Sequence, residues 1–258
     1  PPLTSLSLLF LVSGTLGLLI AAALGQTMRL ARQQWIGVVV FGICQNALYL
    51  GLNFVAMQTI AASLAAIIAS TMPLLVALVG WLFLGQKIKA LGVAGLIAGV
   101  VGVVIIMGAR ITAGVHLYGL ILCLIGVVSL TIATLAVMGA ASGGNVLMIV
   151  GLQMLVGSAV LWFPALAFET FDVIWNWQLI VAFIYTTIVP GLLATWVWFV
   201  LVGRIGAVKA STFHFLNPFL GVAIAAALLG ESIGLLDVVG VILIAGGILA
   251  VQISKQPT

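Results

Sequence analysis

Nine long apolar runs make up most of this chain, and short connectors separate them. A helix needs about 20 apolar residues to cross a membrane, and each run is close to that length. The strands of a membrane barrel would alternate apolar and polar residues, and these runs do not alternate. The pattern predicts an all-α polytopic membrane protein with spans at 2–24, 35–57, 61–84, 90–108, 117–139, 146–168, 177–202, 207–229 and 235–253.

The second half of the chain repeats the first. A shift of 145 residues aligns 61–107 with 206–252 without a gap. Both copies keep the spacing of a proline inside a helix, a Leu-Gly pair at the helix exit and a row of glycines behind it. We therefore predict two repeats, the first at 1–110 and the second at 111–258.

The first repeat is one span shorter than the second. The span at 146–168 aligns with 2–24, so the span at 117–139 has no counterpart. We expect an opening helix ahead of residue 1, which would complete two five-helix repeats. A nine-span protein is the alternative. Repeats with an odd number of spans lie upside down relative to each other in the bilayer, a plan that many secondary transporters share.

Composition is typical of a chain dissolved in lipid. Hydrophobic residues make up 65% and charged residues 5%, and the mean hydropathy is +1.45. A soluble domain carries charge on about a quarter of its residues. The net charge of +4 is dispersed, and no Lys/Arg cluster with interleaved aromatic residues occurs. Nucleic acid is therefore not an expected partner.

The charged residues predict the orientation. If residue 1 lies outside, the outer loops hold Arg110 and all four acids, which are Glu169, Asp172, Glu231 and Asp237. The other basic residues then lie in inner loops or the tail, as the positive-inside rule requires. The C-terminus is therefore predicted to be cytoplasmic. These inner residues are Arg29, Arg32, Lys87, Lys89, Arg204, Lys209 and Lys255.

Several motifs resemble the EamA branch of the drug/metabolite transporter superfamily. They are Pro73 and Pro218 in the fourth helix of each repeat, the exits at 84–88 (LGQKI) and 229–233 (LGESI), and the opening Pro2 followed by Leu9-Phe10. Two positions depart from the family pattern. Gln86 replaces the glutamate that Glu231 keeps, and Leu9 stands where many members carry an arginine. Aromatic-amino-acid exporters of the YddG type also lack that arginine.

The resemblance covers essentially the whole chain. It implies a ten-helix basket with a central cavity in a bacterial inner membrane, and the export of small metabolites. The expected partners are a small-molecule substrate and the lipid bilayer. We expect a monomer, because two repeats can enclose a cavity within one chain, and we expect neither a cofactor nor a metal.

Polar side chains inside the spans are candidates for the cavity, since they are costly in lipid unless they face a partner or water. Gln45, Tyr49 and Asn53 follow one another at intervals of four residues, which places them on one face of a helix. The remaining candidates are Asn46, Ser70, Thr187, Thr195, Trp198, Ser211, His214 and Asn217.

Each candidate also has a structural interpretation. Serine and threonine in membrane helices often bond to their own backbone or to a neighbouring helix, and His214 could make an interhelical hydrogen bond. Pro73, Pro190 and Pro218 are candidate hinges or gates, because proline frees a carbonyl and bends a helix. Static kinks are the alternative. The glycine rows at 95–102 and 240–247 predict close helix packing.

The predicted mechanism follows from the absence of carboxylates deep in the spans. Facilitated diffusion or weakly coupled exchange by alternating access is favoured over proton antiport. Neutral amides, hydroxyls and aromatic rings suit amino acids better than strong anions. A lipid-linked substrate flippase or a channel is the alternative. An enzyme is a remote one, because the phosphate-loop-like run at 80–87 lacks the Ser or Thr that must follow its lysine.

Overall fold

The computed structural model describes residues 1–83, 85, 88–112, 114–140, 144–206 and 210–254, and its elements within these ranges are all helical. In this part of the chain, eight helices are long and apolar enough to cross a membrane. A shorter apolar helix, α12 (Asn217–Leu229), follows the 3-10 segment η3 (Ser211–Leu216). The all-α polytopic fold is therefore confirmed.

The helices divide into two compact units. Unit 1 contains Pro1–Phe54 and Ile132–Ala207, and unit 2 contains Val55–Thr131 and Val208–Thr258. The short helix α3 (Gly51–Ala56) and the long helix α7 (Leu117–Ala140) each begin in one unit and end in the other. Each unit thus combines segments from both predicted repeats. The repeat boundaries themselves stay a prediction.

Unit 1 is built on an antiparallel pair of helices, α1 (Pro2–Ala23) and α8 (Val146–Phe168). The pair packs closely at two glycines, because a Cβ on Gly151 would lie 2.9 Å from the carbonyl oxygen of Gly14. The remaining spans of the unit are irregular. The first runs from α2 (Arg32–Phe41) into η1 (Gly42–Leu50), and the second runs from α9 (Trp177–Thr186) through η2 (Thr187–Leu193) into α10 (Ala194–Ile205).

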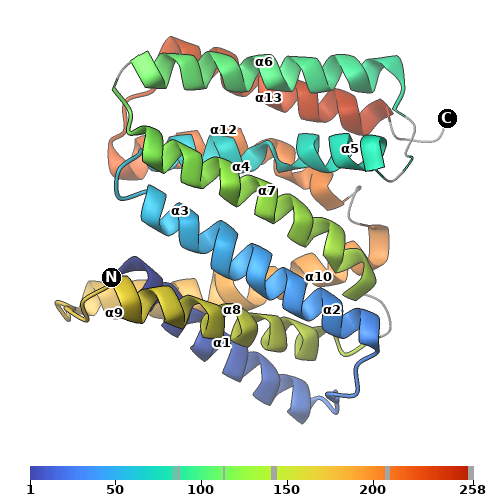
Figure 1. Cartoon of the computed structure of the whole chain (residues 1–258), viewed down its shortest axis with the longest axis vertical. Helices are drawn as coiled ribbons and strands as arrows, with labels where there is room; N and C mark the ends of the chain where they lie inside the picture. The colour runs from blue at the N-terminus through green and yellow to red at the C-terminus, as the bar shows by residue number, and fades with distance from the viewer. Residues whose placement is uncertain (84, 86–87, 113, 141–143, 207–209, 255–258) are drawn as a thin grey trace. The chain divides into compact units, whose positions relative to one another are not determined.

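Unit 2 is built in the same way on α6 (Ala90–Thr112) and α13 (Leu235–Ser254), which lie side by side in Figure 1. A Cβ on Gly95 would lie 2.6 Å from the carbonyl oxygen of Gly247, so only glycine permits this approach. The prediction that the glycine rows serve helix packing is confirmed. The unit also contains α4 (Ala62–Ser70), which packs on α12, and α5 (Met72–Phe83).

Two of the packed pairs join helices that the sequence shift makes equivalent, namely α1 with α8 and α6 with α13. A third pair joins α4 to α12, whose counterpart under the shift is α5. Each pair is antiparallel, since hydrogen bonds join the beginning of one helix to a residue at the end of its partner. The antiparallel packing of the two equivalent pairs is consistent with the predicted upside-down repeats, which stay a prediction.

Candidate functional site

Two π-helical segments lie in the spans that carry most of the candidates of unit 1. They begin at Gly42 and at Thr187, which are 145 residues apart and thus equivalent in the repeat. π-Helical turns are rare and often mark functional sites. Pro190 lies inside η2, where it has no N–H to donate and its ring displaces the carbonyl of Thr186 from an α-helical bond. Irregular backbone in a membrane is tolerated where protein or a wet cavity covers it.

The candidate side chains of these two spans, which lie in the π-helical segments or in the helices α3 and α10 that follow them, divide into half-buried and buried groups. Gln45, Tyr49, Thr195 and Trp198 are half-buried. The Asn53 side chain is buried and donates to the Tyr49 carbonyl oxygen at 2.7 Å. Thr187 is buried as well, and its hydroxyl donates to the carbonyl of Phe183 at 2.6 Å. The half-buried group is therefore only partly covered by the rest of the described chain, and its contact with a substrate stays a prediction.

Asn46 contributes to helix packing. Its side chain is 2% exposed, and its Nδ2 donates to the backbone oxygen of Gln153 at 3.1 Å and to Gln153 Oε1. Gln153 lies in α8 and is fully buried. This hydrogen-bonded pair holds η1 against α8. Sequence reasoning missed Gln153, although an amide within the apolar run at 146–168 was a signal that could have revealed it.

A reciprocal serine pair joins α1 to α8. Ser158 Oγ donates to the Ser7 carbonyl oxygen at 2.8 Å, and Ser7 Oγ donates to the Ser158 carbonyl oxygen at 3.0 Å. Both side chains are buried. Because each hydroxyl bonds to the partner helix, the pair stabilises the centre of unit 1 and is not a substrate contact.

Unit 2 has helix interruptions beside its two prolines. The α-helix stops at Ser70 and resumes at Met72, directly before Pro73. The 3-10 segment η3 gives way to α12 at Asn217, directly before Pro218. These breaks are equivalent under the repeat shift. Their physical cause is the same, since proline cannot donate to the preceding turn.

Hydrogen-bonding side chains line these breaks. The hydroxyls of Ser70 and Thr71 donate to the carbonyl oxygens of Ile67 and Ile68, each at 2.6 Å. Asn217 Nδ2 and His214 Nδ1 are 2.7 Å apart. His214 is half-buried and Asn217 is exposed. The side chain of Ser211 lies outside the described residues.

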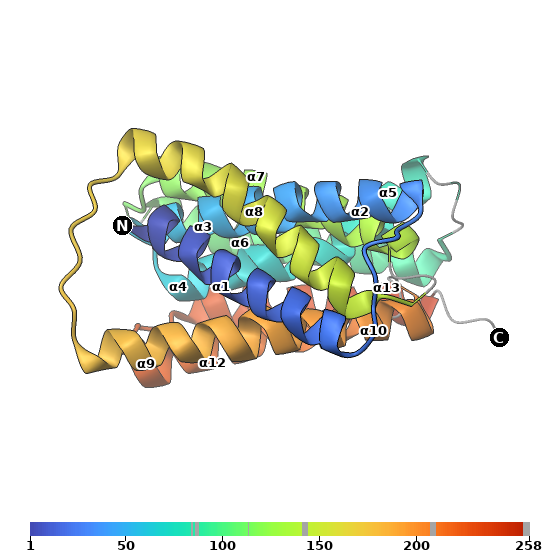
Figure 2. The same cartoon turned by 90° about the horizontal axis from the view of Figure 1, so that it is seen from below.

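Unit 1 also contains an apolar cavity of about 260 Å³ that sequence reasoning did not predict. It lies between α1, α9 and the connector that joins α8 to α9. Figure 2 shows that connector as an extended loop at one end of the unit. Its walls include Leu8, Val12, Phe171, Trp175 and Phe183. Thr4 and Ser5 add hydroxyl groups to this otherwise apolar lining.

Known proteins match both halves of the chain. The EamA-like transporter family matches residues 1–108 and 117–252. The chain belongs to this family. An uncharacterized transporter of Bacillus subtilis, YvbV, is 27% identical over 257 residues, which cover 99% of this chain and 84% of YvbV. A solved crystal structure covers 97% of this chain and 88% of its own with a TM-score of 0.72. Its sequence identity is 20%, so it shows a shared fold alone.

This EamA-like protein is thus a multi-pass membrane transporter. Its polar candidates are amide, hydroxyl, aromatic and imidazole groups. Such side chains form hydrogen bonds to neutral or zwitterionic molecules, whereas a strong anion would need an arginine or lysine at depth. The convergence of the candidates on one cavity, and the hinge role of the three prolines, stay predictions.

Proposed function

We propose that this EamA-like transporter exports small neutral or zwitterionic metabolites, with amino acids as the main substrate class. The supporting observation is a half-buried set in the two spans that contain the repeat-equivalent π-helical segments: Gln45 and Tyr49 in η1, and Thr195 and Trp198 in α10, which follows η2. Amides and a hydroxyl can bind the ammonium and carboxylate groups of an amino acid, and the two rings can pack on its side chain. Leu9 adds the YddG-type resemblance and favours aromatic amino acids.

Transport proceeds by alternating access in a monomer of the bacterial inner membrane, with the C-terminus in the cytoplasm. The spans carry no deep carboxylate to bind a coupling proton, so facilitated diffusion or weakly coupled exchange is the proposed mechanism. The breaks at Pro73, Pro190 and Pro218 are the proposed hinges, because interrupted helices bend with less loss of hydrogen bonding.

A flippase for a lipid-linked substrate is the second candidate function. The apolar cavity of unit 1 favours it, since an acyl or isoprenyl chain fits an apolar wall better than an amino acid does.

Counterflow of labelled amino acids into reconstituted vesicles tests the proposal. A carrier saturates and shows counterflow, whereas a channel shows neither. We expect Tyr49→Ala and His214→Ala each to lower counterflow about tenfold, the effect of losing one substrate hydrogen bond or aromatic contact. Tyr185→Ala is the matched control, because Tyr185 is exposed on α9. Unchanged transport of every amino acid in the Tyr49, Asn53 and His214 variants would contradict the proposed cavity.

A further inference from the structure

A carboxylate links the two helices of the central pair in unit 1 at one end of that pair. Glu169 follows directly after α8, and its Oε1 accepts the backbone N–H of Leu3 at 2.7 Å. Its Oε2 accepts from the backbone N–H of Thr4 at 2.8 Å and from the Thr4 hydroxyl at 2.7 Å. The end of α8 is thereby tied to the first turn of α1.

Unit 2 contains the same arrangement. Glu231 follows α12, and its two oxygens accept the backbone N–H groups of Ala62 at 2.8 Å and Ser63 at 3.1 Å. These residues form the first turn of α4. Both glutamates lie at helix ends that the charge distribution predicts to be outside.

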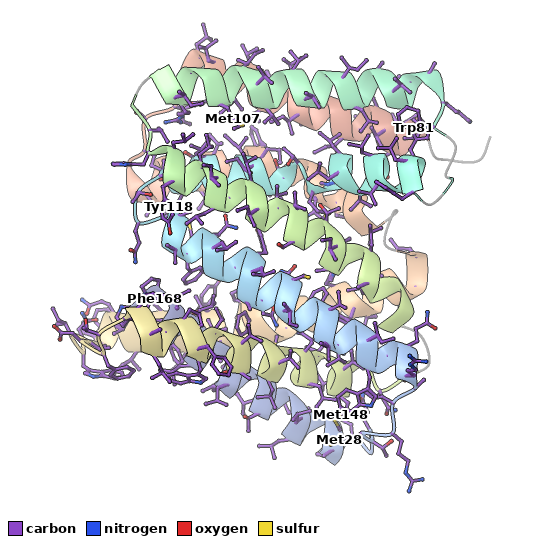
Figure 3. The ribbon with its side chains drawn as sticks, in the orientation of Figure 1. Met28, Trp81, Met107, Tyr118, Met148 and Phe168 are labelled. Atoms are coloured by element: carbon purple, nitrogen blue, oxygen red, sulfur yellow. The ribbon has the colours of Figure 1, made fainter. Side chains whose placement is uncertain are left out.

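The opposite end of the α1–α8 pair is tied by a neutral side chain. Gln26 follows α1, and its Oε1 accepts the backbone N–H of Met148 in the first turn of α8 at 3.0 Å. Met148 and Phe168 are labelled in Figure 3 and mark the two ends of α8. Met148 aligns with Thr4 under a shift of 144 residues, so Gln26 and Glu169 cap equivalent turns at opposite ends of the pair.

The two kinds of cap differ in strength. A hydrogen bond to an ionised acceptor is about twice as strong as a neutral one. The partial positive charge at a helix N-terminus adds a further attraction for a carboxylate.

Burial raises the pKa of Glu169, but the hydrogen bonds from Thr4 and Leu3 lower that pKa by more. For Glu231, burial likewise raises the pKa, and the bonds from Ser63 and Ala62 together with the charge of Arg110 outweigh it. Both glutamates are therefore ionised at neutral pH.

We propose that Glu169 and Glu231 are gating residues, which latch the outer ends of their helix pairs and bias the transporter toward the state closed to the outside. The proposal rests on the proposed function, because it assumes alternating access. The weaker neutral cap at Gln26 lets the inner end of its pair separate first. The empty transporter consequently rests open to the cytoplasm, ready to load a substrate for export.

Cysteine accessibility on the two sides of the membrane tests the latch without a transport assay. Ala165 in the last turns of α8 and Ala21 in the last turn of α1 are both buried. Ala165→Cys reports the outer end and Ala21→Cys the inner end, each in a Cys44→Ala/Cys123→Ala background. The full chain is treated with a membrane-impermeant maleimide, applied from outside for Ala165→Cys and from inside for Ala21→Cys.

We expect Glu169→Gln to raise the labelling rate at the outer reporter about fivefold and to lower it at the inner reporter, as expected when a charge-assisted bond becomes neutral. Gln26→Glu should shift both rates in the same direction, because an ionised acceptor strengthens the inner cap on Met148 and keeps the inner end closed. Ala65→Cys in the first turns of α4 should respond to Glu231→Gln as Ala165→Cys responds to Glu169→Gln. Asp172→Asn is the charge-matched control, because Asp172 is exposed on the same predicted side, and it should change neither rate.

Unchanged rates in Glu169→Gln would overturn the latch, and so would an equal rise at both ends, which would indicate a loosened fold instead of a shifted equilibrium. A normal labelling response combined with no counterflow of any amino acid would contradict the proposed function and leave the latch standing. The two failures are therefore distinguishable.

Discussion

At the scale of single residues, the buried amide pair of Asn46 and Gln153 shows how polar side chains in lipid are used. A buried amide is costly unless it is hydrogen-bonded, and here one amide supplies the donor and the other the acceptor. Asn46 and its neighbour Gln45 have similar chemistry, yet Asn46 is fully covered and Gln45 is half-buried. Their surroundings differ, because Asn46 points at α8, where Gln153 carries a matching group.

Removing one partner of this pair should destabilise the protein more than removing both. Gln153→Leu leaves the Asn46 amide without a side-chain acceptor, which costs about 1–3 kcal/mol. The double variant Asn46→Leu/Gln153→Leu should recover most of that loss, since neither polar group remains. Thermal unfolding in detergent measures the cycle. Gln45→Leu is the control and should shift the Tm by less, and additive effects of the two substitutions would argue against the pair.

At the scale of helices, close packing and helix interruption both follow from particular residues at repeat-equivalent positions. The glycines of α6 and α13 remove side chains where the two helices cross, and the prolines mark where α4–α5 and η3–α12 are interrupted. Neighbouring glycines are not interchangeable. A Cβ on Gly247 would meet the carbonyl oxygen of Gly95, whereas a Cβ on Gly246 would meet no atom within 4 Å.

This difference predicts the effect of two adjacent substitutions. Gly247→Val should force α6 and α13 apart and prevent the protein from being purified as a single monodisperse species. Gly246→Val should be tolerated, because its side chain points away from the contact. Its free energy of unfolding should stay within about 0.5 kcal/mol of the parent's. Size-exclusion chromatography and thermal unfolding separate the two results. Similar behaviour of both variants would contradict the packing of this pair.

At the scale of the whole molecule, acidic caps recur in both units on the side that is predicted to face outside. Each glutamate has a lowered pKa in the folded protein. Its contribution to stability is therefore present above the ordinary glutamate pKa of about 4.3, and it is lost as the pH falls through the lowered value.

We expect the Tm of the wild-type protein to be level near neutral pH. It should fall as the pH drops below the ordinary glutamate pKa of about 4.3 and through the lowered pKa of the two caps. The double variant Glu169→Gln/Glu231→Gln should start from a lower Tm and depend less on pH, because its caps cannot be protonated. Thermal unfolding in detergent between pH 3 and pH 7 measures both curves, with Asp172→Asn as the control. Parallel curves for wild type and double variant would mean that other carboxylates control acid stability.

Much of the architecture could be predicted from the sequence. Span positions, the repeat and the close packing at glycines depend on the apolar length and on residue spacing, which are local properties of the chain. The candidate site was harder to predict. The polar candidates stay a prediction as a site, and Gln153 and the pair of Ser7 and Ser158 were missed because their partners lie more than 100 residues away.

The sequence by itself determined that the chain crosses a membrane several times as helices, because lipid requires each span to satisfy its own backbone hydrogen bonds. The repeated spacing of its motifs also indicated a repeat transporter. Only the tertiary structure decided which polar side chains are used in packing. It also showed that Glu169 and Glu231 cap partner helices while Gln26 caps the opposite end of α8. The physical reason is that the environment of a side chain in a helix depends on the neighbouring helix, and residue spacing within one span does not specify that neighbour.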